Sequence, residues 1–116
     1  MAKNFKDGLA RVKFNGKWGY INKSGIFVIK PSFERAKNFS EKLAPVRVNR
    51  MWGYIGKTGV LLIKPRFNEA KSFSNGLARV RTGKTWGFID SKGAWVIRPQ
   101  FSDAKNFSDG MARIKK

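Results

Sequence analysis

Lysine and arginine recur at regular intervals along this chain, and rows of positively charged side chains can bind polyanions. The 116 residues hold 25 Lys and Arg against 7 Asp and Glu, which gives a formal net charge of +18. Many of the cations repeat at a spacing of 34 residues. Equivalent positions align in a stacked array, so these side chains would form positive stripes. The candidate polyanion-binding residues are Arg11, Lys13, Lys30, Arg47, Lys64, Arg79, Arg81, Arg98 and Arg113.

The same cations have a plainer interpretation as solvated surface. Exposed strands often carry lysine, partly because charge blocks edge-to-edge aggregation. A surface that needs only solubility usually mixes both signs, however, and acids are few here. The sequence therefore leaves two interpretations open, a polyanion site or charge that serves solubility alone. Under the first, the candidate anions are nucleic acid, an acidic polysaccharide, an acidic protein and an anionic membrane surface.

Catalytic and metal chemistry are not indicated by the residue types. Cys and His are absent, which removes the usual thiolate and imidazole bases and metal ligands. The acids form no evident acid–base pair, and no glycine-rich phosphate loop precedes a helix. We therefore expect no enzyme activity, no catalytic residue, no metal and no cofactor. The sequence also lacks an apolar run of the roughly 20 residues that span a membrane, and an apolar stretch of signal-peptide length at its start.

A Trp-Gly pair is the most regular motif and recurs within residues 17–21, 51–55 and 85–89. Large aromatic residues dominate small cores, so we interpret the tryptophans as core. The alternative is a ladder of exposed rings that stack on bases or sugars. The glycine would let another segment, such as an aromatic side chain, approach closely. The expected structural repeat core is Trp18, Gly19, Trp52, Gly53, Trp86 and Gly87.

The segments around this motif predict short antiparallel strands. Apolar and cationic residues alternate over 9–14, as in a half-buried strand. Asn15-Gly16 then predicts a type I′ hairpin into a second strand over 17–22. A glycine-terminated turn leads to a third strand over 26–30, with counterparts over 60–64 and 94–98. Its four consecutive apolar residues predict burial on both faces, hence a central strand.

The connector after each third strand carries a different spacing. Pro31 is expected to end the strand because it lacks the N–H that a ladder needs. Phe33, Ala36 and Phe39 follow at steps of three, which predicts one or two turns of 3₁₀- or α-helix.

These elements predict an all-β fold built from three antiparallel three-stranded units of period 34, with short helical turns in the connectors. The chain is one domain, 1–116, with units at 5–38, 39–72 and 73–106 and a partial unit at 107–116. A solenoid and a closed, propeller-like ring both fit this repeat, as does a slice of a longer array. In the ring, a strand within 107–115 would complete the unit that starts at residue 5.

The repeat resembles the WG-repeat family, also called KWG repeats, which is found in tandem in many bacterial proteins. The segments FSNGLARV, KWGYINKSG and FVIKPSFERAKNFS carry the resemblance, and it covers essentially the whole chain. The resemblance implies a β-rich, non-catalytic module with no catalytic residue to transfer. Two functions follow as hypotheses. One is a binding or scaffold module that uses the cationic stripes, and the other is a structural or envelope-associated module that binds protein.

Overall fold

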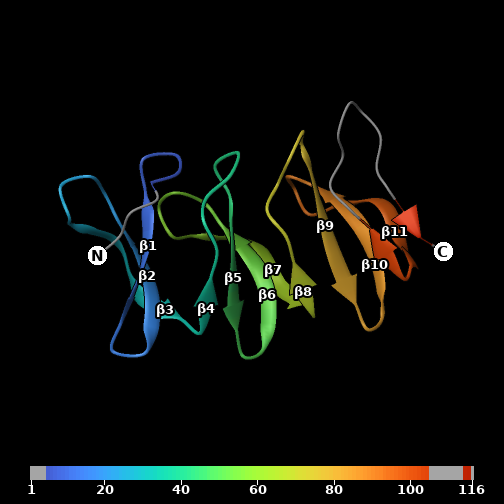
Figure 1. Ribbon diagram of the computed structural model, residues 1–116, viewed down its shortest axis with the longest axis horizontal. Coiled ribbons are helices and arrows are strands. Elements are labelled where there is room, and N and C mark those ends of the chain that lie inside the picture. The colour runs from blue at the N-terminus through green and yellow to red at the C-terminus, as the bar shows by residue number, and fades with distance from the viewer. Residues whose placement is uncertain (1–4, 105–113, 116) are drawn as a thin grey trace.

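The described part of the chain is built only of strands and turns. A computed structural model of the chain describes residues 5–104, 114 and 115, and among them there is no helix. Three antiparallel sheets stand side by side in a row (Figure 1), and two short strands follow at its end. The all-β prediction is confirmed.

The sheets keep sequence order and differ only in their first strand. The first sheet contains three strands, β1 (Ala10–Phe14), β2 (Lys17–Ile21) and β3 (Phe27–Phe33). The second adds a two-residue strand and orders β4 (Arg35–Ala36), β5 (Ala44–Val48), β6 (Met51–Ile55) and β7 (Leu61–Phe67). The third repeats this order with β8 (Glu69–Ala70), β9 (Leu77–Thr82), β10 (Thr85–Asp90) and β11 (Trp95–Phe101). The last two strands pair as β12 (Asp103–Ala104) and β13 (Ile114–Lys115).

The predicted hairpin between the first two strands is confirmed. Asn15 and Gly16 both have positive φ, 52° and 82°, as a type I′ turn requires. The second sheet builds the same turn from Asn49 and Arg50, at φ 51° and 69°. Arginine seldom adopts this conformation, and the Glu34 carboxylate accepts hydrogen bonds from both backbone N–H groups there. That contact stabilises a turn whose sequence is otherwise unfavourable.

The third strand differs from its prediction, because it is an edge strand and not a central one. β3, β7 and β11 each pair on one side only, and the proline lies within the strand instead of ending it. Proline is tolerated at an edge or a bulge, where no ladder N–H is needed. The register shifts between Trp18 and Tyr20, so the strand bulges across Gly19. A Cβ on Gly19 would lie 2.5 Å from the Ile29 carbonyl oxygen. The predicted close approach is therefore real, but backbone and not an aromatic ring makes it.

The predicted helical turns in the connectors were also wrong. The described connectors hold the short strands β4 and β8, and Ala36 pairs with Val46 of the neighbouring strand β5. Phe33, Ala36 and Phe39 are all buried, as their spacing suggested. A bend at Glu34 between β3 and β4 places them on one side of the chain without a helix. Helical spacing alone did not separate these two backbone paths, because both put every third residue on one side.

The hydrophobic cores lie between sheets and not within one sheet. The first core joins residues of sheets one and two: Leu9, Tyr20, Ile29, Phe33, Ala36, Phe39, Ala44, Val46 and Ile55. The second joins sheets two and three: Leu43, Trp52, Tyr54, Ile63, Phe67, Ala70, Phe73, Ala78, Val80 and Ile89. Tyr20 and Tyr54 occupy equivalent positions and make equivalent contacts. Tyr20 packs edge-on against Phe39 and Tyr54 against Phe73, each with ring centres 4.9 Å apart. Each sheet is therefore stabilised by its neighbours.

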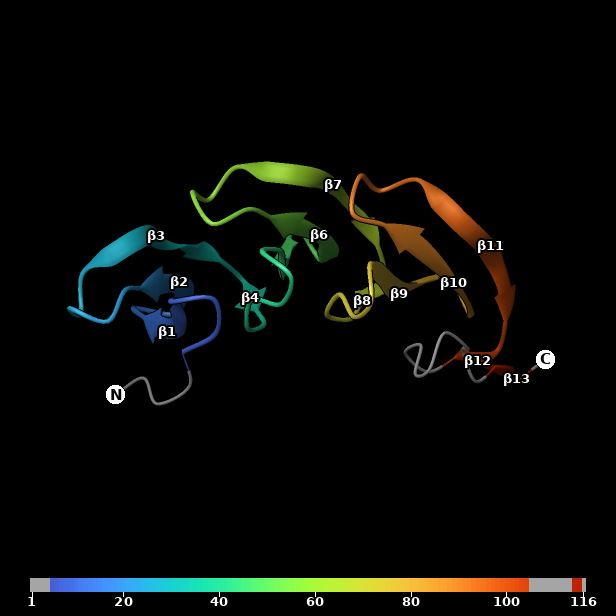
Figure 2. The same ribbon diagram turned by 90° about the horizontal axis from the view of Figure 1, so that it is seen from above.

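The described residues form an open arc and not a closed ring. Figure 2 shows β3, β7 and β11 along the outer side of the arc and β4 and β8 on the inner side. β13 pairs with β12 of the preceding segment, not with the first sheet at the far end of the row. The molecule measures 44 × 31 × 22 Å. The ring alternative is thus not formed by the part of the chain that the structure describes, although residues 107–113 lie outside it.

Candidate anion-binding site

A hollow of about 390 Å³ lies between the first and second sheets and reaches the start of the third. Cations dominate its lining, with four Lys or Arg side chains against one carboxylate, and two tryptophans form part of the wall. The lining residues are Arg11, Trp18, Arg35, Ala36, Lys37, Arg47, Trp52, Asn68 and Glu69. We call this space the first hollow.

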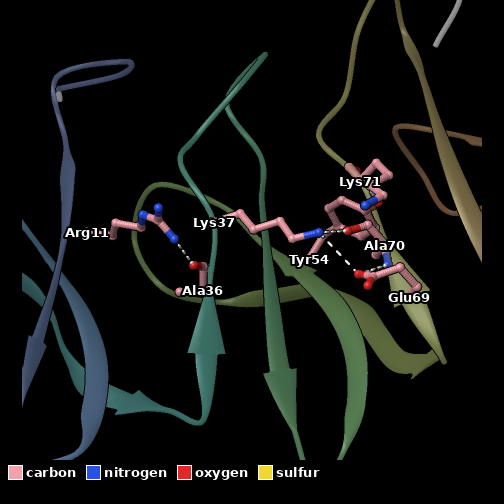
Figure 3. Close-up of polar contacts among 7 residues, drawn as sticks. All are labelled: Arg11, Ala36, Lys37, Tyr54, Glu69, Ala70 and Lys71. Atoms are coloured by element: carbon pink, nitrogen blue, oxygen red, sulfur yellow. Dashed lines mark hydrogen bonds and ion pairs between the residues drawn. The ribbon is translucent and has the colours of Figure 1, made fainter. Parts of the chain in front are cut away.

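Arg11 extends from the first sheet to the second. Its Nη1 donates a 2.7 Å hydrogen bond to the Ala36 carbonyl oxygen in β4 (Figure 3). Its guanidinium carbon also lies 5.2 Å from the centre of the Trp18 ring, within the range of a cation–π contact. Backbone and indole together fix the position of this charge.

Lys37 makes the corresponding contact between the second sheet and the third. Its Nζ lies 4.7 Å from the centre of the Trp52 ring. The same atom donates hydrogen bonds to Glu69 Oε1 at 3.1 Å and to the Ala70 carbonyl oxygen at 2.8 Å (Figure 3). Burial lowers the pKa of Lys37, and the Glu69 carboxylate opposes that shift. Burial acts to raise the pKa of Glu69, but the hydrogen bonds from Lys37 and the Ala70 N–H outweigh it and lower that pKa. Glu69 is therefore ionised at neutral pH.

Arg47 already has an anionic partner. Its Nε lies 3.1 Å from Glu34 Oε1. The N–H groups of Arg50 and Asn49 and the Arg47 side chain hold the pKa of Glu34 below its usual value. The Glu34 carboxylate thus connects Arg47 to the 49–50 turn, and Arg47 is also one of the residues that line the first hollow.

Arg35 has no such partner. The side chain is exposed and makes no hydrogen bond or ion pair with the residues that the structure describes. It also lies directly across the strand pair from Arg47. Like charges at opposed positions destabilise a sheet. In the third sheet the equivalent position holds Glu69, opposite Arg81, so a complementary pair replaces the repulsive one.

The predicted polyanion-binding residues do not share one surface. Arg11 and Arg47 line the first hollow. Lys13 is exposed on β1, while Arg79 and Arg81 are half-buried on β9. The remaining described ones are exposed on the outer strands, at Lys30, Lys64 and Arg98. Arg113 lies outside the described residues. The stripes therefore do not merge into one face.

Two lining cations were missed by the sequence reasoning. Lys37 belongs to a regular register that repeats at Lys71, but its position in the connector gave no sign that it reaches a tryptophan. Arg35 was overlooked because it breaks the repeat: its equivalents are the acids Glu69 and Asp103. That change of sign is the signal that would have found it.

The Trp-Gly pairs combine packing with exposure. Trp52 is 6% exposed and belongs to the second core, whereas Trp18 and Trp86 are half-buried. Lys71 and Arg79 lie 5.9 and 5.6 Å from the Trp86 ring centre. Trp18 packs against the first core and Trp52 lies in the second, and all three indoles contact a cation. Gly19, Gly53 and Gly87 are buried against the backbone of the outer strand.

Two further features were sought in the described residues, a cluster of metal ligands and a membrane-spanning helix. Residues 5–104, 114 and 115 contain no group of three acidic, cysteine or histidine side chains that could hold a metal ion. None of their segments is a helix long and apolar enough to cross a membrane.

Comparison with known sequences finds one family and no individual relative. A family described as "WG containing repeat" matches residues 1–18, 18–51, 52–86 and 86–116. No curated protein and no solved structure matches the chain.

Proposed function

This chain belongs to the WG containing repeat family, and we propose that it is a non-catalytic binding module whose first hollow binds a polyanion. The proposed molecule is an array of three 34-residue units, at 5–38, 39–72 and 73–106. The repeated cations on β1, β5 and β9 would contribute to the same binding surface, and two of them, Arg11 and Arg47, line the hollow. Catalysis forms no part of this proposal, because no pair of groups in the hollow is arranged as acid and base.

The observation that carries the proposal is the opposition of Arg35 and Arg47 across β4 and β5. An anion between two guanidinium groups would convert their repulsion into two charge-assisted hydrogen bonds. Arg35 has the freedom to turn toward such a ligand, since nothing in the described structure holds it. The matching position in the third sheet is neutralised by Glu69. The anion site is therefore strongest at one place and not equal in every unit.

The walls of the first hollow favour an anion that also carries a flat ring. Trp18 is half-buried, and Arg11 already lies over its ring. Bases of single-stranded nucleic acid stack on such aromatic and guanidinium surfaces while their phosphates meet cations. A sulfated polysaccharide would use the same cations without the stacking. Nucleic acid read by base sequence is not supported, because the described structure has no recognition helix.

The proposal is tested by following tryptophan fluorescence during titration with single-stranded DNA, duplex DNA and heparin at two salt concentrations. Binding that weakens steeply with salt is expected, because phosphate or sulfate contacts release counterions. A shift of emission seen only with single strands would indicate that a tryptophan stacks on the bases. No binding of any of the three polymers at low salt would refute the proposal.

A charge reversal separates the first hollow from general basicity. Arg35→Glu removes the free cation without breaking a contact of the fold, and it should weaken binding by at least about tenfold, as for a lost charge-assisted contact. Lys84→Glu in an exposed hairpin turn makes the same change of net charge away from the hollow. Equal losses from the two variants would mean that only total charge matters. Reversing Lys13, Arg47 and Arg81 together is a poorer test, because Arg47 stabilises the fold through Glu34.

The alternative function is a structural or envelope-associated module that binds protein and uses its charge for solubility. The position of Lys30, Lys64 and Arg98 favours it, since these cations lie on edge strands. Charge and proline at such edges prevent the pairing of sheets between molecules. This alternative predicts that Arg35→Glu and Lys84→Glu leave function equally intact.

A further inference from the structure

The exposed apolar side chains gather on the outer strands. Eight large apolar residues are exposed among those that the structure describes, and seven lie at or next to the start of β3, β7 or β11. The eighth, Phe14, has its ring centre 6.2 Å from that of Phe27 and joins the same group. We call these residues the outer patch: Phe14, Ile26, Phe27, Val28, Val60, Leu61, Leu62 and Val96.

Cations surround the outer patch and acids are nearly absent from it. Residues 17–33 and 51–67 contain no Asp or Glu. The matching region of the third sheet holds Asp90, whose carboxylate accepts hydrogen bonds from backbone N–H groups of its own turn. The exposed cations in the outer strands and in the turns that lead into them are Lys23, Lys30, Lys57, Lys64, Arg66, Lys92 and Arg98. The surface is thus apolar and positive together.

The backbone of the outer strands is poorly suited to a strand-forming partner. β3, β7 and β11 are free edges, which in principle could pair with an extended peptide. Each strand carries a proline without an N–H, and each bulges across the glycine of its neighbour. Both features are devices that blunt an edge against pairing. The partner must therefore be recognised by side chains.

We propose that the outer patch docks on an anionic phospholipid surface. Aliphatic side chains would enter the interface between headgroups and acyl chains, and the surrounding cations would lie at the level of the anionic headgroups. The charge of the outer patch is complementary to such a surface and not to a neutral one. This docking surface is separate from the first hollow, which lies between the sheets.

The curvature of the arc indicates which part of the outer patch would contact a flat membrane surface. β7 forms the crown of the outer side in Figure 2, with β3 and β11 falling away on either side. A flat surface therefore meets the second sheet first. Val60 and Leu62 are 58% and 57% exposed there, so polar substitutions remove little core packing.

Sedimentation of the full chain with vesicles tests the proposal. We expect binding to phosphatidylcholine vesicles that contain phosphatidylserine, weaker binding at higher salt, and none to phosphatidylcholine alone. Val60→Ser with Leu62→Ser should weaken partitioning by at least about tenfold, because the inserted apolar area is lost. The matched pair Ile26→Ser with Val28→Ser, away from the crown, should weaken it less. Lys57→Gln with Lys64→Gln should reduce the dependence on salt.

Three results would overturn this proposal. The first is an absence of binding to the anionic vesicles at low salt, and the second is binding that the Val60→Ser and Leu62→Ser pair leaves unchanged in a folded protein. The third is a dimer that this pair converts to monomer in light scattering, which would show that the outer patch joins copies of the chain. Arg35→Glu separates the two sites. It should weaken binding to heparin and leave the effect of Val60→Ser and Leu62→Ser on vesicle binding unchanged.

Discussion

Gly53 shows what a single residue does in this fold. A Cβ at this position would lie 2.5 Å from the Ile63 carbonyl oxygen and 2.7 Å from the Pro65 nitrogen. Both atoms are backbone, so neither can rotate away as a side chain can. The glycine of each Trp-Gly pair is required because the outer strand crosses directly over it.

Substituting this glycine should therefore destabilise the protein markedly. We expect Gly53→Ala to lower the free energy of unfolding by about 1–3 kcal/mol or more, as for an overpacked core. Gly56→Ala is the matched control, since its Cβ would meet the flexible end of the Leu62 side chain. Urea denaturation measures both. A midpoint that moves equally in the two variants would contradict the backbone contact as the cause.

The Trp-Gly motif also shows how much of the local structure could be predicted from residue types alone. Its glycine predicted a close approach, and Trp52 is buried as core. Nothing in the motif told which segment approaches, because the bulge that brings Pro65 over Gly53 depends on the pairing of β6 with β7. The residue types left burial in the core and exposure as stacking rings as alternatives for all the tryptophans, whereas Trp52 is buried and Trp18 and Trp86 are half-buried.

At the scale of elements, acids connect the turn of one unit to that of the next. Glu41 accepts hydrogen bonds from the backbone N–H groups of Asn75 and Gly76, at 2.7 and 2.9 Å. Asp7 accepts one from the N–H of Lys42 in the same way, at 2.9 Å. Each of these acids therefore caps a turn that leads into the following sheet.

Removing one of these caps should loosen the contact between sheets. We expect Glu41→Ala to lower the free energy of unfolding by about 0.5–2 kcal/mol, the usual range for a lost cap. Glu41→Gln keeps one carbonyl acceptor and should lose less. Thermal or urea unfolding of the two variants compares them, and a larger loss in Glu41→Gln than in Glu41→Ala would contradict the capping role.

The Lys37–Glu69 pair makes the docking of the second and third sheets sensitive to acid. The pKa of Glu69 is lowered from 4.5 in the folded protein, so its contribution to stability is present above that value. The contribution is lost as the pH falls through the lower folded pKa. The loss of stability between about pH 5 and pH 3 should therefore be smaller in Glu69→Gln than in the parent chain. Urea midpoints across this range measure it, and parallel pH curves would rule the pair out.

At the scale of the whole molecule, the second sheet belongs to both cores. Ile55 packs in the first core, and its neighbour Tyr54 packs in the second. A sheet with an apolar side chain on each face cannot lose one neighbour without exposing that core. The row of sheets should thus behave as one cooperative unit, in the manner of short repeat arrays.

Cooperative unfolding is directly measurable. The urea transitions followed by tryptophan fluorescence and by far-UV circular dichroism should coincide, since indoles from every sheet report the first and the backbone reports the second. Two separated transitions would mean that the sheets unfold independently. A core substitution such as Ile55→Ala should then shift both signals together, by about 2–5 kcal/mol.

The sequence by itself determined the all-β class, the hairpins and the positive φ of Asn15 and Gly16. Those features depend on neighbours a few residues apart, such as the Asn15-Gly16 turn and the alternation in β1. Tertiary structure alone decided that β3 is an edge, that the connector at Arg35 is a strand, and that Arg35 faces Arg47. Each of these depends on which segments pair and on how one sheet packs against the next. The period of a repeat gives the spacing of equivalent residues but does not give either arrangement. The first hollow follows from both, because Arg35 meets Arg47 through the pairing of β4 with β5, and Arg11 reaches β4 only where the first sheet packs on the second.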